Sequence, residues 1–327
     1  MNDQYSLLAA WAPVVAGVVT LLLTRLMLVS AIFTRIQDVP NERSLHDTPI
    51  PRIGGLALML GVLTAWHLLK DQTTSWLYSG VIVLLLLSLL DDLRDVAARW
   101  RLLGHLVVAA GFVALGMAPM PIYLAIVLVL GVVWVTNLYN FMDGANGLAG
   151  GMAVFGFGFY AMTAAALGDI HFALVNLVIV ASSLAFLCFN FGKAQVFMGD
   201  AGSIPLGYLV AAIGLLGWQR GLWPIWFPVV TFSSFVADAT VTLLKRLLRG
   251  ERVWQAHHEH YYQRVIRMGW SHRRTALVEY GLMMASGVVA MLAVLMPSWG
   301  GLVLLCAYLC VKAVLMCWVD RSWKRYA

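Results

Sequence analysis

Acidic, amide and histidine side chains gather in five short clusters of this chain, at or near the ends of long apolar segments. The clusters are Asp91-Asp92, Asp143, Asp200, Asp238 and a histidine-rich run at 257–260. Charge close to hydrocarbon is costly, so ionisable groups beside apolar segments mark a functional site by default. Carboxylates suit a divalent cation or proton transfer. The clusters therefore predict an enzyme embedded in a membrane.

Asp91 and Asp92 directly follow an apolar run, so two carboxylates emerge together where hydrocarbon ends and water begins. Repulsion between adjacent carboxylates is relieved by a cation or by retention of one proton. The pair therefore suits divalent-metal binding or proton abstraction. The alternative is a solvated helix end that Arg94 and Arg99 neutralise.

Asp143 lies between an apolar segment and a glycine-rich restart, in the company of Asn140 and Asn146. The glycines allow a ligand to approach the backbone closely, and the amide and carboxylate side chains offer it both donors and acceptors. We interpret this cluster as a ligand site, since a simple turn between two helices needs fewer polar groups.

Asp200 has a similar setting, flanked by Gly199 and Gly202 just before a new apolar segment. Amides at a helix N-terminus suit phosphate, and a nearby carboxylate suits the magnesium that accompanies phosphate. Phe197 is a candidate to stack on a base. A lipid-facing position is the alternative for this phenylalanine.

The longest and most basic loop carries the histidine run. Its candidate residues are His257, His258, Glu259, His260 and Arg264. Four consecutive residues do not converge on a metal as an i, i+4 pair on a helix does, so we favour phosphate or sugar contacts. A pH-sensitive surface loop is the alternative. Asp238 lies about two turns before this loop, and pairing with Lys245 or with a neighbouring helix is an equal alternative to a role in the site.

Composition identifies an integral membrane protein. The chain has 327 residues, is 61% hydrophobic and 12% charged, and has a mean hydropathy of +0.82, whereas globular proteins contain about 25% charged residues. We place about eleven spanning segments, at 7–33, 53–69, 76–90, 102–118, 121–139, 148–167, 172–190, 203–217, 222–244, 276–296 and 300–319. The sequence has no long linker and no visible repeat. We therefore expect one all-α polytopic domain over residues 1–327.

The 22 lysines and arginines predict the orientation, because loops retained in the cytoplasm carry the excess. Outside the apolar segments, Lys70 and Arg220 are the only ones on the side opposite the acidic clusters. We therefore expect the N-terminus outside, the C-terminus in the cytoplasm, the clusters facing the cytoplasm and a first segment that is retained. Lysines and arginines in cytoplasmic loops that face anionic lipid headgroups account for the net charge of +6, so we expect no nucleic-acid partner.

The four cysteines all lie inside apolar segments and lack zinc-site spacing. They are Cys188, Cys306, Cys310 and Cys317. We expect them to be small buried hydrophobic residues.

In combination, the motifs resemble the polyprenyl-phosphate N-acetylhexosamine-1-phosphate transferases, glycosyltransferase family 4, from about residue 41 to residue 274. The similarity rests on five elements, Pro-Arg-Ile-Gly-Gly at 51–55, Asp91-Asp92, Asn-Leu-Tyr-Asn-Phe-Met-Asp-Gly at 137–144, Phe-Met-Gly-Asp-Ala-Gly-Ser at 197–203, and the histidines at 257–260. The resemblance implies attack by the phosphate of undecaprenyl phosphate on the β-phosphate of a UDP-N-acetylhexosamine. UMP is then released, with Mg²⁺, or Mn²⁺ as a substitute, on the pyrophosphate.

The resemblance also implies roles for individual residues. Asp200 is the implied principal metal ligand, Asp92 a second one, and Asp91 and Asp92 together handle the lipid phosphate. His260 is implied as a catalytic residue near the phosphates or sugar. The implied substrate-binding residues are Arg52, Asn137, Asn140, Asp143, Asn146, Asn190, Phe197, His257, His258 and Arg264.

Two departures from the family pattern refine the expected function. Asn146 stands where many relatives carry an aspartate, which puts any role needing a negative charge there in doubt. Tyr262 and Gln263 stand where several relatives have histidines, so the chain looks closer to members that initiate O-antigen in the bacterial inner membrane. That favours a small donor, UDP-GlcNAc or a UDP-linked 6-deoxy-N-acetylhexosamine, over a peptide-bearing one. The expected partners are undecaprenyl phosphate, the UDP-sugar and the bilayer, with a homodimer left open.

Two other classes of protein remain as alternatives. A proton- or ion-coupled transporter uses intramembrane carboxylates near the bilayer midplane, but here the acids gather at segment ends. A membrane metallohydrolase needs convergent ligands that the histidine spacing does not promise. Release of UMP separates the three, because a transferase needs an acceptor, a hydrolase does not, and a carrier releases nothing.

Overall fold

The computed structural model describes residues 3–30, 37–38, 49–69, 72–94, 96–253 and 257–326, and for residues 3–8, 72–74, 92 and 93 it describes the backbone alone. The side chain of Asp92 therefore lies outside the described part. The principal helices are α1 (Asp3–Val29), α2 (Gly54–Leu69), α3 (Gln72–Arg94), α4 (Ala98–Gly111), α5 (Ile122–Phe141), α6 (Leu148–Ala166), α7 (Ile170–Asn190), α8 (Asp200–Gln219), α9 (Trp226–Thr231), α10 (Ser233–Leu248), α11 (Tyr261–Arg267), α12 (His272–Leu295) and α13 (Ser298–Tyr326).

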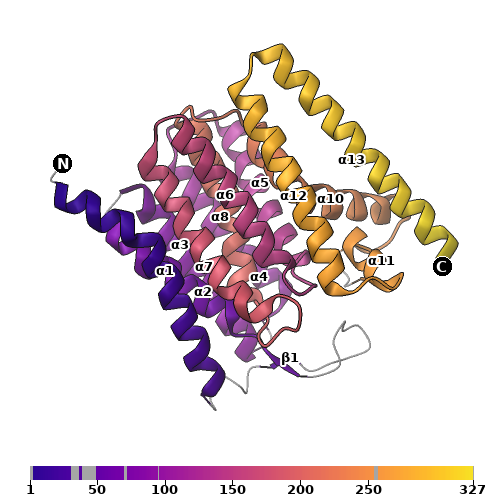
Figure 1. Ribbon diagram of the computed structural model, residues 1–327, viewed down its shortest axis with the longest axis horizontal. Coiled ribbons are helices and arrows are strands. Elements are labelled where there is room, and N and C mark those ends of the chain that lie inside the picture. Colours follow the sequence, from indigo (N-terminus) through magenta and orange to yellow (C-terminus); the bar gives the residue numbers. More distant parts are fainter. Residues whose placement is uncertain are drawn as a thin grey trace.

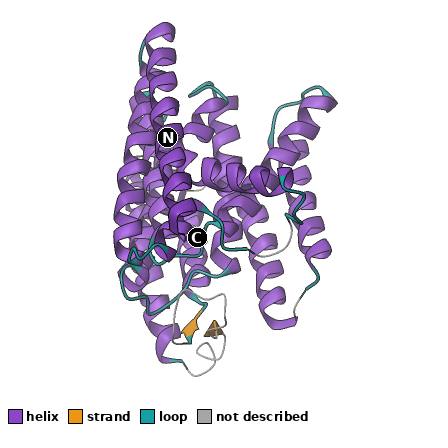
Figure 2. Ribbon diagram, turned by 90° about the vertical axis from the view of Figure 1, so that its right-hand side faces the viewer, coloured by secondary structure: helices purple, strands orange, loops and turns teal. Residues whose placement is uncertain are grey.

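The predicted all-α membrane architecture is confirmed. Within the described ranges, eight helices are long and apolar enough to cross a membrane, namely α1, α4 with its π-helical extension Phe112–Gly116, α5, α6, α7, α8, α12 and α13. Helix α2 and most of α3 are shorter apolar helices. The strands β1 (Gln37–Asp38) and β2 (Ile50–Pro51) pair antiparallel, and Figure 2 shows them at one end of the helical bundle.

The prediction of one continuous span over 222–244 is wrong. This segment is divided into α9 and α10, which meet at Phe232, and Figure 1 shows α10 lying across α12. Serine and threonine side chains near the break can compete with the helical backbone for hydrogen bonds. The Ser286 hydroxyl of α12 donates to the carbonyl of Thr231 at 3.2 Å, so a backbone group at the break has a partner inside the protein.

Helix α8 forms the centre of the bundle. Its side chains are buried continuously from Ala201 to Gly217, and it packs against α2, α3, α5 and α6. Helix α13 has the opposite character, because Gly301 is the one buried residue in its described length. It lies along the outside of α12 (Figure 1). The start of the central helix, where Asp200 lies, is therefore held rigidly.

Backbone pairing brings two of the sequence motifs together. The Phe197 N–H donates to the carbonyl of Pro51 at 2.8 Å, and the Gly54 and Gly55 N–H groups donate to Phe197 and Met198, each at 2.9 Å. Gly55 and Gly202 meet where α2 and α8 begin, and a Cβ on either would collide with the backbone of the other. The glycines of the 51–55 motif thus permit close approach of two helix N-termini.

The prediction that the cysteines are buried is wrong. All four are exposed on the protein surface, Cys188 on α7 and the other three on α13. The outside of a membrane protein is as apolar as its interior, so hydrophobic surroundings in the sequence do not distinguish the two.

Candidate active site

A single arginine joins two of the predicted carboxylates. Arg101 Nη1 of α4 donates to Asp91 Oδ2 at 2.7 Å, and it lies 3.4 Å from Asp200 Oδ2. Asp91 also accepts a hydrogen bond from the Val96 N–H at 2.8 Å. The end of α3 and the start of α8, far apart in sequence, therefore present carboxylates to the same cation. Sequence reasoning placed Arg101 merely among the cytoplasmic charges and missed its position in the site.

Asp143 is the third carboxylate of this group. It lies deep in the protein in the loop between α5 and α6, although part of its surface remains accessible. Burial raises the pKa of the Asp143 carboxyl well above its ordinary value, the charge of Asp200 raises it further, and Arg52 opposes the rise. Arg52 is itself held by Asp38 of β1 at 2.6 Å. The two short strands thus hold the Arg52 guanidinium near the carboxylates.

Asn140 and Asn190 join the loops that carry these carboxylates. Asn140 Oδ1 accepts a hydrogen bond from the Ser203 hydroxyl at 2.6 Å, which links the end of α5 to the start of α8. Asn190 Oδ1 accepts from the Gly147 N–H at 2.7 Å, and its Nδ2 donates to the Val196 carbonyl at 2.8 Å. Both polar atoms of the Asn190 amide bond the protein backbone. The prediction that this residue holds the uracil stays a prediction.

Asn146 uses its amide in a way that an aspartate could not. Its Nδ2 donates to the Gly192 carbonyl at 2.9 Å, and Gly192 has a φ of +75° that favours glycine. The Asn146 backbone N–H donates to Nδ1 of His272, the first residue of α12, at 3.3 Å. The departure from the family pattern at this position therefore has a structural explanation, since a carboxylate has no N–H to donate.

Asp238 organises the histidine loop. Its Oδ1 accepts from the Tyr261 N–H at 2.9 Å and its Oδ2 from the Tyr262 N–H at 3.1 Å, while His260 Nδ1 lies 3.1 Å from Oδ1. These amides are the first N–H groups of α11, so a carboxylate there complements the helix dipole. His260 is 3% exposed. Its ring contacts Asp238, and the implied catalytic role of His260 stays a prediction.

The histidine loop also reaches the Asp143 element. The Tyr262 hydroxyl donates weakly to the Phe141 carbonyl at 3.5 Å and closes against Gly144, where a Cβ would overlap it. The rings of His260 and Tyr262 are stacked with centroids 6.0 Å apart. Within the described residues, Tyr262 therefore connects α11 to the loop that follows α5.

The charged residues of this loop are extensively paired. Glu259 accepts from Arg249 Nη2 at 2.5 Å and lies 3.7 Å from Arg264 Nη2. Arg264 Nη1 donates to Asp320 of α13 at 2.9 Å. Burial, with the charges of His260 and Arg246 adding to it, lowers the pKa of His257 to about 4. His257 is therefore neutral at physiological pH.

The structure brings most of the predicted residues into two connected groups. The first contains Asp91, Asp143, Asp200, Arg52, Asn140, Asn146, Asn190 and the backbone of Phe197, and the second contains His257, His258, His260 and Arg264. Asn137 lies beside the first group, where its Nδ2 donates to the Val133 carbonyl one turn earlier at 2.7 Å. Asp320, in the C-terminal helix, is a further residue that sequence reasoning did not single out.

The carboxylates suit a magnesium ion. Among the residues that the structure describes, no group of three histidine, cysteine, aspartate or glutamate side chains is arranged to hold a metal by itself. Magnesium is usually held by one or two carboxylates together with substrate phosphates and water. Asp91 and Asp200, which already share one cation in Arg101, match that requirement.

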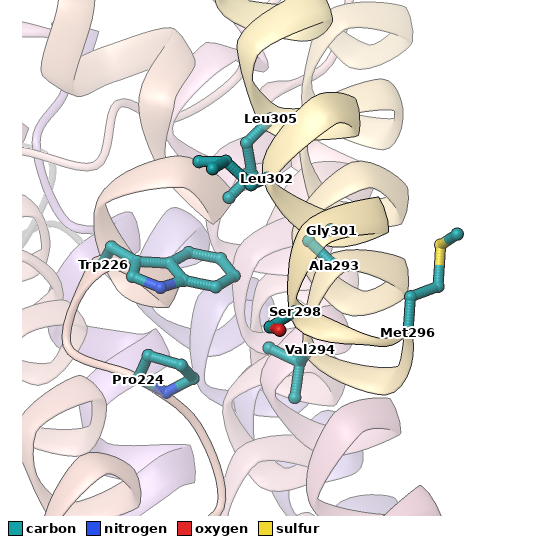
Figure 3. Close-up of a pocket in the computed structure, with 9 residues that line it drawn as sticks. All are labelled: Pro224, Trp226, Ala293, Val294, Met296, Ser298, Gly301, Leu302 and Leu305. Carbon is teal, nitrogen blue, oxygen red and sulfur yellow. The ribbon is translucent and has the colours of Figure 1, made fainter.

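A separate apolar crevice of about 420 Å³ lies between the α9 region and the α12–α13 hairpin. Figure 3 shows Pro224 and Trp226 on one side of it and Leu302 and Leu305 on the other. Its lining has no residue in common with the carboxylate group or the histidine loop.

The chain is similar to transferases that join an N-acetylglucosamine phosphate to a polyprenyl phosphate, as their names state. A family profile described as glycosyl transferase family 4 matches residues 75–217. A probable undecaprenyl-phosphate N-acetylglucosaminyl 1-phosphate transferase from Bacillus subtilis is 31% identical, over 86% of this chain and 83% of the relative. A decaprenyl-phosphate N-acetylglucosaminephosphotransferase from Mycobacterium leprae is 29% identical, over 77% of this chain and 76% of the relative. An undecaprenyl-phosphate alpha-N-acetylglucosaminyl 1-phosphate transferase from Yersinia pestis is 26% identical, over 90% of this chain and 87% of the relative.

Proposed function

Because this chain belongs to glycosyl transferase family 4, we propose that it transfers an N-acetylhexosamine 1-phosphate from a UDP-sugar to a polyprenyl phosphate. An oxygen of the lipid phosphate attacks the β-phosphorus of the donor. The bond from that phosphorus to the oxygen bridging the two phosphates breaks, and UMP leaves with the electron pair. The products are a polyprenyl diphosphate sugar and UMP.

The observation that carries this proposal is the meeting of Asp91 and Asp200 at Arg101, beside Asp143. A reaction between two phosphates needs cations that hold negative oxygens and carboxylates that hold a metal. Arg101 and Arg52 would bind phosphate oxygens of the two substrates. Magnesium on Asp91 and Asp200 would stabilise the charge that develops on the leaving UMP.

We further propose UDP-GlcNAc as the donor and undecaprenyl phosphate as the acceptor. The support is that the names of all three relatives specify N-acetylglucosamine and two of them undecaprenyl phosphate. An O-antigen product, a cytoplasmic active site and an inner-membrane location are parts of the same proposal. A transporter is less well supported, because the carboxylates are coupled to arginines and to glycine-rich loops at helix ends.

The decisive experiment measures UMP release by purified protein with magnesium, undecaprenyl phosphate and a panel of UDP-N-acetylhexosamines. Asp200→Asn is expected to lower the rate by at least about a hundredfold, since it removes transition-state charge stabilisation. Asp169→Asn is the matched control. Asp169 caps the N-terminus of α7, and its carboxylate lies 2.8 Å from Arg220 Nη1, so its described partners are not residues of the site. UMP release without acceptor would indicate a hydrolase, and no release from any donor would contradict the proposal.

A further inference from the structure

Asp320 of the C-terminal helix α13 contacts three polar side chains of α10 and α11. Asp320 Oδ2 lies 2.5 Å from Lys245 Nζ and accepts from the Tyr261 hydroxyl at 3.2 Å. Asp320 Oδ1 accepts from Arg264 Nη1 at 2.9 Å. Lys245 also donates to the Tyr261 hydroxyl at 2.6 Å. One carboxylate thus ends a network that joins α10, α11 and α13.

Arg264 is the residue that most needs this carboxylate. Its side chain is 5% exposed, and its other acidic neighbour, Glu259, lies further away at 3.7 Å. A buried guanidinium without a close counterion is costly, so removal of the nearer partner destabilises its position. The guanidinium also lies over the Tyr261 ring at 5.1 Å from the centroid, which ties Arg264 to the start of α11.

These contacts contrast with the rest of α13. The described length of this helix buries Gly301 alone, and Figure 1 shows its C-terminal end next to α11. A helix that needed only to remain in the membrane would not need a carboxylate directed at the histidine loop. Asp320 is therefore placed to act on α11.

We propose that Asp320 is a positioning residue for the transfer reaction, an inference that rests on the proposed function. By holding Arg264 and Tyr261, it fixes α11. Tyr262, the next residue on α11, contacts the loop that carries Asp143. The C-terminal helix thereby sets the distance between the histidine loop and the carboxylate group, which would both contact the donor under the proposed function.

The test compares Asp320→Asn and Asp320→Glu with Trp323→Leu. Trp323 is a matched control, because it lies on the same helix and its ring contacts Arg267 of α11, with the guanidinium 5.7 Å from the ring centroid, rather than the Asp320 carboxylate network. Steady-state UMP release gives KM for the UDP-sugar and kcat. Asp320→Asn is expected to raise KM about tenfold, because the ion pairs of Asp320 with Lys245 and Arg264 are both weakened and α11 is no longer fixed. Asp320→Glu is expected to restore most of the binding, and Trp323→Leu to leave KM unchanged.

Hydrogen exchange of the 257–267 amides provides a second readout that does not depend on activity. Faster exchange there in Asp320→Asn, but not in Trp323→Leu, is the expected result. Unchanged KM and unchanged exchange in Asp320→Asn, with the wild type active, would overturn the inference. Equal losses of folded protein and of kcat in both variants would also overturn it, since that outcome identifies a general anchor. A wild type that releases no UMP would instead contradict the proposed function.

Discussion

Asn146 and Asn190 are polar residues of the site whose side chains bond the protein backbone. Asn190 joins Gly147 to Val196, and Asn146 donates to Gly192. Such residues are easily taken for ligand contacts in a sequence, because an amide in a glycine-rich loop suits both roles. At the scale of single residues, the structure therefore separates groups that hold the loops from the carboxylates and arginines that face one another.

Asn146→Asp is expected to destabilise the protein by about 1–3 kcal/mol, because it replaces the donor to the Gly192 carbonyl with a second acceptor. It also places another negative charge near Asp143, so activity is not expected to rise. Thermal unfolding and UMP release measured on the same preparation check this. An unchanged midpoint of unfolding with higher activity would show that the position needs a negative charge, as in many relatives.

His257 gives the stability of the protein a defined pH dependence. Its pKa is lowered to about 4 by burial and by neighbouring cations, against an ordinary value of about 6.5. Between these values the unfolded chain binds more protons than the folded one, so His257 makes stability fall as pH decreases from about 6.5 to about 4. His257→Gln is expected to flatten this part of the curve. Unfolding midpoints across that range test it, and an equally steep curve in the variant would contradict it.

At the scale of helices, two glycines let the backbones of α2 and α8 approach closely, and this contact positions residues of the active site. The N-termini of α2 and α8 pack with Gly55 against Gly202, and the backbone around Phe197 pairs with residues 51–55. This contact places Arg52 beside Gly199, the residue that precedes Asp200. The arrangement depends on residues that lack side chains, so it can be broken by adding a single carbon atom.

Gly55→Ala is expected to destabilise the protein by about 1–3 kcal/mol or to prevent folding, because its Cβ would meet the backbone of α8. Gly131→Ala is the matched control in the apolar helix α5, where a new Cβ has no neighbour within 4 Å. Alanine there is expected to be neutral or stabilising by up to about 1 kcal/mol. Unfolding midpoints and the yield of folded protein in detergent check both variants. Equal behaviour of the two would refute the role given to Gly55.

At the scale of the whole molecule, the polar chemistry is concentrated at one end of a bundle whose sides are apolar. Eight described helices have the length and composition to cross a bilayer. The break between α9 and α10 lets α10 lie across its neighbours, with Lys245 and Arg246 in its last turn. This geometry suits an enzyme that takes one substrate from the membrane and the other from water.

The distribution of charge predicts which loops face the cytoplasm. In a background with the four cysteines replaced by alanine, Arg252→Cys is expected to react with a membrane-impermeant maleimide only after cells are opened. Leu167→Cys, in the exposed turn between α6 and α7, is expected to react in intact cells. Labelling measured by mass shift checks both sites together. The reverse pattern would invert the topology and move the carboxylates to the outer face.

The sequence by itself determined the membrane class, the helical architecture and the motifs that carry the family resemblance, since hydropathy and short-range spacing are local properties. Only the tertiary structure decided that Arg101 lies between Asp91 and Asp200, that Asp238 caps α11, and that the cysteines face outward. It also decided that the segment at 222–244 is broken. These features depend on which helix faces pack together. Residues far apart in sequence make those contacts, so no local pattern specifies them.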